Sequence, residues 1–147
     1  MSRRWPNHLW IVRYRLSSGN AQRDQADAAG LEFIDVAERD INVLLSDLGV
    51  QQSLSQSGGF AAMPESRRPD IVLASPYVRA AETARCSHDV GGVQKGTAQH
   101  VDERRREREF GVLDRLTRAG IVQRDPGHTE ARTRLGKFYY RPPGGES

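Results

Sequence analysis

Two arginines stand at places in the sequence where a bound anion could be recognised. Arg13 directly follows the apolar run at residues 9–12 (LWIV), and Arg79 comes four residues after the run at residues 70–75 (DIVLAS). In an open parallel α/β sheet, ligands bind beyond the carboxyl ends of the strands. If the two runs are neighbouring strands, both guanidinium groups would meet at one point and would suit a phosphate group. The alternative is that each arginine is a solvated or ion-paired surface residue.

The elements that would position these arginines form a strand–helix unit. Residues 9–12 and 70–75 predict two short buried strands. Ser75 can cap a helix whose first residue is Pro76, which would place Arg79 in the first turn. A strand followed by a tight cap and a helix is the βα unit of a parallel sheet. The predicted fold class is therefore α/β, a mostly parallel sheet flanked by helices, in a single domain over residues 1–147.

Further elements are predicted around this unit. In the first half of the chain they are a helix at 21–29 ended by Gly30, and a helix from Ser46-Asp47 that Gly58-Gly59 weaken or end. In the second half they are a short strand at 98–101, a short helix at 111–121 and a helix at 129–140. The short helix would turn Leu113, Leu116 and Ile121 inward. The last helix would use Ala131, Leu135, Phe138 and Tyr139 as its apolar stripe until Pro142-Pro143 stops it.

Length and composition indicate a soluble globular chain with one core. The chain has 147 residues, of which 37% are hydrophobic and 28% charged. The N-terminal apolar run is too short for a signal peptide or a membrane span. A single cysteine, Cys86, forms no internal disulfide, which suits a reducing compartment. We therefore expect a cytoplasmic protein with no membrane partner.

The basic charge balance does not indicate a nucleic-acid partner. The net charge is +3 and the pI about 9.4, but residues 102–109 hold four arginines and four carboxylates and are locally neutral. No nucleic-acid recognition motif accompanies the charge. The spacing of the four histidines suggests no metal site.

Several blocks of the sequence, taken together, resemble the histidine phosphatase, or phosphoglycerate mutase-like, superfamily. These blocks are residues 9–20 (LWIVRYRLSSGN), 45–49 (LSDLG), 68–84 (RPDIVLASPYVRAAETA), 102–121 (DERRREREFGVLDRLTRAGI) and 136–147 (GKFYYRPPGGES). The resemblance implies a parallel-rich α/β fold and a phosphate-bearing small molecule as ligand. It also implies hydrolysis or transfer of a phosphomonoester through a phosphohistidine, with no metal or organic cofactor.

The resemblance also implies roles for individual residues. Arg13 and Arg79 match the two arginines that hold the phosphoryl oxygens, and Asn20 matches a phosphate-side residue of the first loop. Glu107 matches the glutamate that donates a proton to the leaving oxygen. An alternative for Glu107 is that it pairs with the neighbouring arginines.

Two positions depart from the superfamily pattern. Tyr14 occupies the place of the nucleophilic histidine, and Arg15 occupies the place of a glycine. A phenol with a reference pKa of about 10 is protonated at neutral pH and is a poor nucleophile. We therefore expect a catalytically impaired member. The alternatives are a non-catalytic phosphate-binding or interaction module, or a decayed fragment with no independent function.

The end of the chain is a further departure from the superfamily pattern. Members continue through another helix and a late strand that ends in a second histidine, whereas this chain stops at Ser147. None of the four histidines matches that second histidine by position. The domain is therefore expected to be incomplete at its C-terminus, with apolar surface left for a dimer partner or another chain.

Overall fold

The structure, a computed structural model, describes residues 5–136 and 138–146. Its helices are α1 (Ser18–Ala28), α2 (Asp47–Ala61), α3 (Val78–Asp89), α4 (Arg118–Arg124) and α5 (Pro126–Leu135), and its strands are β1 (Val72–Ala74) and β2 (Gln99–Val101). Short 3₁₀ turns are η1 (Asp40–Asn42), η2 (Glu65–Arg67), η3 (Glu103–Arg105) and η4 (Gly111–Leu113).

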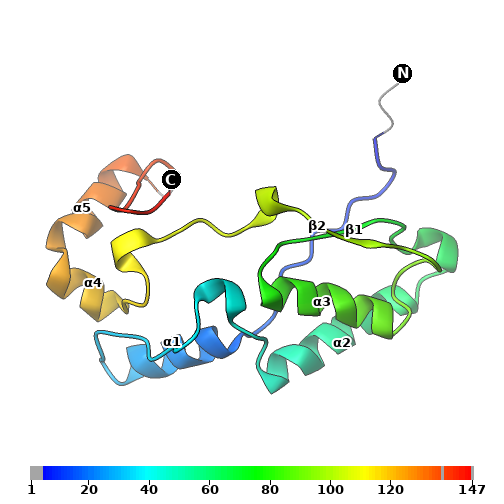
Figure 1. Cartoon of the computed structure of the whole chain (residues 1–147), viewed down its shortest axis with the longest axis horizontal. Coiled ribbons are helices and arrows are strands. Elements are labelled where there is room, and N and C mark those ends of the chain that lie inside the picture. The colour runs from blue at the N-terminus through cyan, green and yellow to red at the C-terminus, as the bar shows by residue number, and fades with distance from the viewer. Residues whose placement is uncertain (1–4, 137, 147) are drawn as a thin grey trace.

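A β1–α3–β2 unit confirms the predicted α/β class. The two strands pair in parallel, with Leu73 opposite His100, and α3 forms the connection between them. Figure 1 shows α2 and α3 side by side beneath the strand pair, whereas α4, α5 and the chain end lie at the other end of the molecule. The helices cover one side of the sheet: Ala74 of β1 is buried, whereas its neighbour Leu73 is 46% exposed. None of the described helices is long and apolar enough to cross a membrane.

The strand predicted at residues 9–12 is absent from the described structure. This segment is extended but forms no backbone ladder. It is instead held by the half-buried Trp10, whose ring stacks on Phe60 of α2 with centroids 6.2 Å apart, while its neighbour Ile11 is 89% exposed. The segment is therefore anchored by one side chain and not by strand pairing, which an apolar run alone cannot distinguish.

The first backbone pairing of the N-terminal segment comes at the start of α1. The amide of Ser18 donates to the Leu44 carbonyl at 3.0 Å, and the Ser46 amide donates to the Leu16 carbonyl at 3.0 Å. Ser17 caps α1, so that helix begins three residues before the predicted position. The helix ends before Gly30, which has a φ of +66°, as predicted.

Helix α2 begins as predicted but continues past the expected break. The Ser46 hydroxyl accepts from the Gly49 amide at 3.1 Å, which caps the helix. The helix then runs through Gly58 and Gly59 to Ala61, so the prediction that the glycines end it is wrong. The buried face of α2 packs on α3, where the Ser57 and Ser87 hydroxyl oxygens lie 3.0 Å apart. Packing thus outweighs the low helix propensity of two exposed glycines.

Helix α3 starts two residues later than predicted. Its N-cap is Tyr77 and its first residue is Val78. Ser75 accepts from the Tyr77 amide at 3.4 Å, so Ser75 and Pro76 form a turn between β1 and the helix. Arg79 nevertheless lies in the first helical turn, as predicted.

The helix predicted at 111–121 is split into η4 and α4. Arg115 has a φ of +61°, a value that interrupts a right-handed helix, and Thr117 then caps α4. Leu113 is buried, as predicted, while Leu116 and Ile121 are partly buried.

Helix α5 also differs from its prediction. It ends at Leu135 before Gly136, so Phe138 and Tyr139 lie beyond it and are about four-fifths exposed, with Tyr139 at 81%. The predicted apolar stripe is therefore wrong. The buried contact is made by His128, whose Nδ1 lies 2.5 Å from the hydroxyl of Tyr140.

Candidate functional site

The Arg79 guanidinium is the centre of a charged cluster that joins three parts of the chain. The Arg79 side chain is 2% exposed. Its Nη1 lies 2.5 Å from the Asp40 carbonyl oxygen and 3.1 Å from the Asp40 Oδ1. Its Nη2 lies 3.1 Å from the Asp40 Oδ2 and 3.0 Å from the Glu107 Oε2. Arg79 therefore ties α3 to η1 and to the segment after η3.

Two tyrosine rings lie against the same guanidinium. The Arg79 Cζ is 4.8 Å from the ring centroid of Tyr14 and 4.7 Å from that of Tyr77, within the range of cation–π attraction. The Cζ of Arg13 is 6.0 Å from the Tyr14 ring. The structure thus brings Tyr14 and Glu107 into contact with Arg79, with Arg13 beside the Tyr14 ring. It is the ring face of Tyr14 that meets the cation.

The cluster controls the ionisation of its buried members. Burial lowers the pKa of Arg79, but the hydrogen bond to Asp40 and the charges of Glu107 and Asp40 outweigh it, so the net pKa is raised. Burial, with the charges of Asp40, Glu109 and Glu107, raises the pKa of Tyr77. Arg79 is therefore a permanent cation and Tyr77 a neutral phenol.

Asn20 and the cluster residue Asp40 line the same small cavity. The Asn20 backbone amide donates to the Ser17 hydroxyl at 3.1 Å, in the first turn of α1. Asn20, Arg23, Asp40 and Arg115 are among the residues that line a cavity of about 50 Å³. Asp40 therefore lies between Asn20 and Arg79, because Asp40 contacts the guanidinium and also lines the cavity. A larger, open hollow of about 370 Å³ is lined by none of these residues.

Arg15 points away from the cluster. Its Nε donates to the Gln56 side chain of α2 at 3.2 Å, and the residue is exposed. The Arg15 side chain therefore extends toward α2, as one would expect of an outward-turned side chain at a position where the resemblance implies a glycine.

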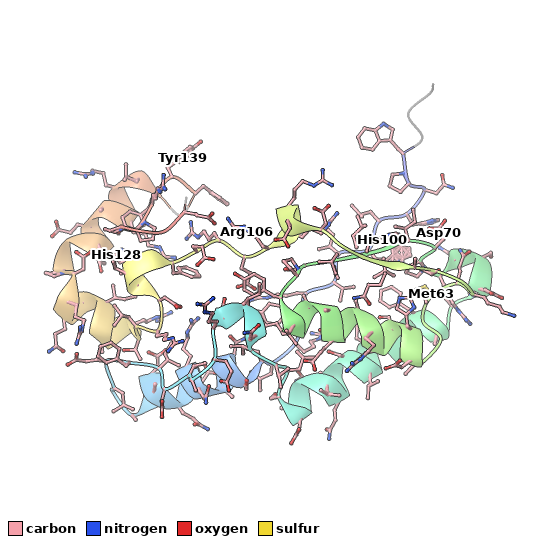
Figure 2. The ribbon with its side chains drawn as sticks, in the orientation of Figure 1. Met63, Asp70, His100, Arg106, His128 and Tyr139 are labelled. Carbon is pink, nitrogen blue, oxygen red and sulfur yellow. The ribbon has the colours of Figure 1, made fainter. Side chains whose placement is uncertain are left out.

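Glu107 pairs with Arg79, which lies 28 residues away from it in the sequence. Two nearby arginines have other partners: Arg106, labelled in Figure 2, pairs with Glu146, and Arg104 of η3 pairs with Asp102 at 2.7 Å. Asp102 has its pKa lowered to about 2, chiefly by the hydrogen bond from the Arg104 side chain.

The comparisons with known proteins place the chain in a family. The family model for the histidine phosphatase superfamily (branch 1) matches residues 31–147. The chain belongs to this superfamily. Asp40, Arg79 and Glu107 lie within the matched residues, whereas Arg13, Tyr14 and Asn20 precede them. No curated protein matches the chain significantly.

Solved histidine phosphatase-like structures resemble this chain over about half of their own length. A native mycobacterial glucosyl-3-phosphoglycerate phosphatase is 29% identical with a TM-score of 0.60, and the match covers 74% of this chain and 46% of that one. Its complex with inorganic phosphate is 28% identical with a TM-score of 0.60, covering 79% and 51%. A protein described as mycobacterial hydrolase 1 is 29% identical with a TM-score of 0.58, covering 72% and 45%.

No histidine is among the contacts of Arg79 in the described part of the chain. Figure 2 shows His100 on β2 and His128 on α5, far from each other. His8 packs edge-on against Trp10 with ring centroids 5.3 Å apart. Among the residues that the structure describes, no group of three or more His, Cys, Asp and Glu side chains could hold a metal ion.

The residue of the cluster that sequence reasoning missed is Asp40. It lies in the stretch AERDIN, which has the composition of an ordinary exposed turn and carries no spacing signal. Only the contact between η1 and α3 identifies it.

Proposed function

We propose that this chain is a histidine phosphatase superfamily protein in which phosphoryl transfer is impaired. The superfamily reaction, as the resemblance implies, begins with attack by a histidine, and Tyr14 stands at that position. A phenol with a reference pKa of about 10 is almost entirely protonated at neutral pH. Its oxygen also lies farther from the backbone than an imidazole nitrogen, which would misplace the attack.

The observation that carries the proposal is the occupation of Arg79. To hold a phosphoryl group, an arginine must offer its terminal N–H groups to the anion's oxygens. Here Nη1 and Nη2 are both engaged, by Asp40 and by Glu107, and two rings lie against the guanidinium. Among the described groups, the Arg79 Nε is buried without a hydrogen-bond partner.

The ligand class follows from the superfamily and its solved relatives. The glucosyl-3-phosphoglycerate phosphatase, crystallised with inorganic phosphate, supports a phosphomonoester as the ligand and hydrolysis as the reaction that has been weakened. Arg13, Arg79 and Asn20 are the proposed phosphate contacts, and Glu107 the proposed proton donor. The Glu107 carboxylate is engaged by the Arg79 guanidinium at 3.0 Å, a contact that a proton donor to a leaving oxygen would have to give up.

An aryl phosphate assay tests this proposal. With para-nitrophenyl phosphate as substrate, we expect the unaltered chain to show no turnover above that of Arg13→Ala. Glu130→Gln is a control, because Glu130 is exposed on α5 and lies outside the charged cluster and the cavity. Turnover that is present in the unaltered chain and in Glu130→Gln but lost in Arg13→Ala would show that the site is active.

A second candidate is a non-catalytic phosphate-binding module. It is supported by Arg13, which is exposed beside Tyr14 and has no carboxylate partner within residues 5–136 and 138–146. Such a site would raise the melting temperature of the chain in millimolar phosphate, since a ligand that binds only the folded state stabilises it. The rise should vanish in Arg13→Ala, and the same melting temperature with and without phosphate would count against this candidate.

A further inference from the structure

We propose that Asp40 sets the anion affinity of the Arg79 site. Its carboxylate occupies the guanidinium at the place where a phosphoryl group would bind, and an external phosphate must displace it. This inference rests on the proposed function, because it takes Arg79 as the phosphate-binding arginine of the superfamily.

The geometry of the pair is that of an anion-binding contact. The two Asp40 oxygens lie 3.1 Å from Nη1 and from Nη2, the parallel two-point arrangement by which arginine binds carboxylate or phosphate. A phosphate on the same two nitrogens would therefore overlap the carboxylate. It would also meet the charge of Glu107, 3.0 Å from Nη2.

The two partners differ in how readily they can move. The Arg79 side chain is 2% exposed whereas that of Asp40 is 48% exposed. Arg79 is therefore the fixed member of the pair, and the Asp40 carboxylate has solvent into which it can turn.

The cavity next to Asp40 supplies a route for the incoming anion. Asn20, two arginines and two further carboxylates line it together with Asp40, namely Arg23, Arg115, Glu38 and Asp114. Of these residues, Asp40 is the one that also contacts the Arg79 guanidinium. Displacement of the Asp40 side chain would join this cavity to the Arg79 guanidinium. Asp40 thus both pairs with the guanidinium and lines the cavity beside it.

Phosphate binding to Asp40→Asn tests the proposal. Asparagine removes the charge but retains the backbone carbonyl that accepts from Nη1, so Arg79 keeps that hydrogen bond. By isothermal titration calorimetry with inorganic phosphate at low salt, we expect Asp40→Asn to bind about tenfold or more tightly than the unaltered chain. The control is Glu130→Gln, which removes a negative charge from an exposed residue of α5 that lines neither the cavity nor the Arg79 cluster.

The outcomes separate this inference from the proposed function. A gain confined to Asp40→Asn supports the inference, whereas no gain, or an equal gain in Glu130→Gln, overturns it. Aryl phosphate turnover is measured on the same samples, and turnover by the unaltered chain would count against the proposed function alone.

A measurement on the unaltered chain keeps the proposal testable if Asp40→Asn does not fold. The Arg79 Nε–H has no partner among the described residues, so its ¹⁵N-detected signal would respond to an arriving anion. The signal is assigned by its loss in Arg79→Lys, which has no Nε–H. We expect it to shift only above about 10 mM phosphate, because the anion must first displace the Asp40 carboxylate. A shift that is complete below about 1 mM phosphate would show that Asp40 does not weaken anion binding and would overturn the inference.

Discussion

Replacing Arg79 with alanine should destabilise the chain by about 3 kcal/mol. The hydrogen bond to the Asp40 carbonyl contributes about 1 kcal/mol. The carboxylates of Asp40 and Glu107 are 48% and 38% exposed, so solvent screening holds each ion pair to about 1 kcal/mol or less. The contacts with the two tyrosine rings contribute about 0.5 kcal/mol each.

Urea unfolding followed by circular dichroism measures this loss. Arg79→Lys keeps the charge but not the two-point contact, and we expect it to lose about half as much. Arg13→Ala serves as an exposed control and should change the free energy of unfolding by less than about 0.5 kcal/mol. A loss below about 1 kcal/mol for Arg79→Ala would refute the reasoning, because the cluster would then be worth no more than one surface ion pair.

Three further predictions follow from other contacts. The double substitution Tyr14→His with Arg15→Gly should not restore aryl phosphate turnover, because Asp40 and Glu107 still hold Arg79; turnover in this variant would contradict that explanation. Burial lowers the pKa of His128 in the folded chain, so the unfolded state binds more protons there, and the melting temperature should fall as the pH drops below about 6.5. His128→Gln should flatten this dependence, and an unchanged pH profile would show that another group causes it. Gly49→Ala should lower the free energy of unfolding by more than about 2 kcal/mol, since the added Cβ would lie 2.0 Å from the Leu16 carbonyl oxygen. At Gly58 an added Cβ has nothing within 4 Å, so Gly58→Ala should stabilise α2 by up to about 1 kcal/mol. Similar urea midpoints for the two variants would contradict the packing argument.

Local signals in the sequence were sufficient for several elements. The Ser46 hydroxyl caps α2 as its position before Asp47 predicted, and the unit from β1 through α3 to β2 is parallel. The superfamily resemblance, based on blocks spread along the chain, is confirmed by the family model over residues 31–147. These features depend on side chains within a few residues of one another, or on a pattern that many positions share.

Other elements depended on contacts that no local pattern contains. The apolar run at residues 9–12 is extended without a ladder because Trp10 packs on α2. Helix α2 continues through Gly58 and Gly59 because its other face packs on α3. In the C-terminal part, Arg115 adopts a positive φ and divides a predicted helix.

The candidate site shows most clearly which features come from local sequence and which come from tertiary contacts. The sequence by itself determined the family and the place of Arg79 in the first turn of the helix that follows a strand. That Tyr14 and Arg15 replace a histidine and a glycine of the superfamily stays a prediction. Only the tertiary structure decided that Arg79 is already occupied, because Asp40 and Glu107 lie 39 and 28 residues away from it in the chain. An ion pair between such distant residues is set by how η1 and the segment after η3 pack around α3, and no spacing in the sequence encodes it.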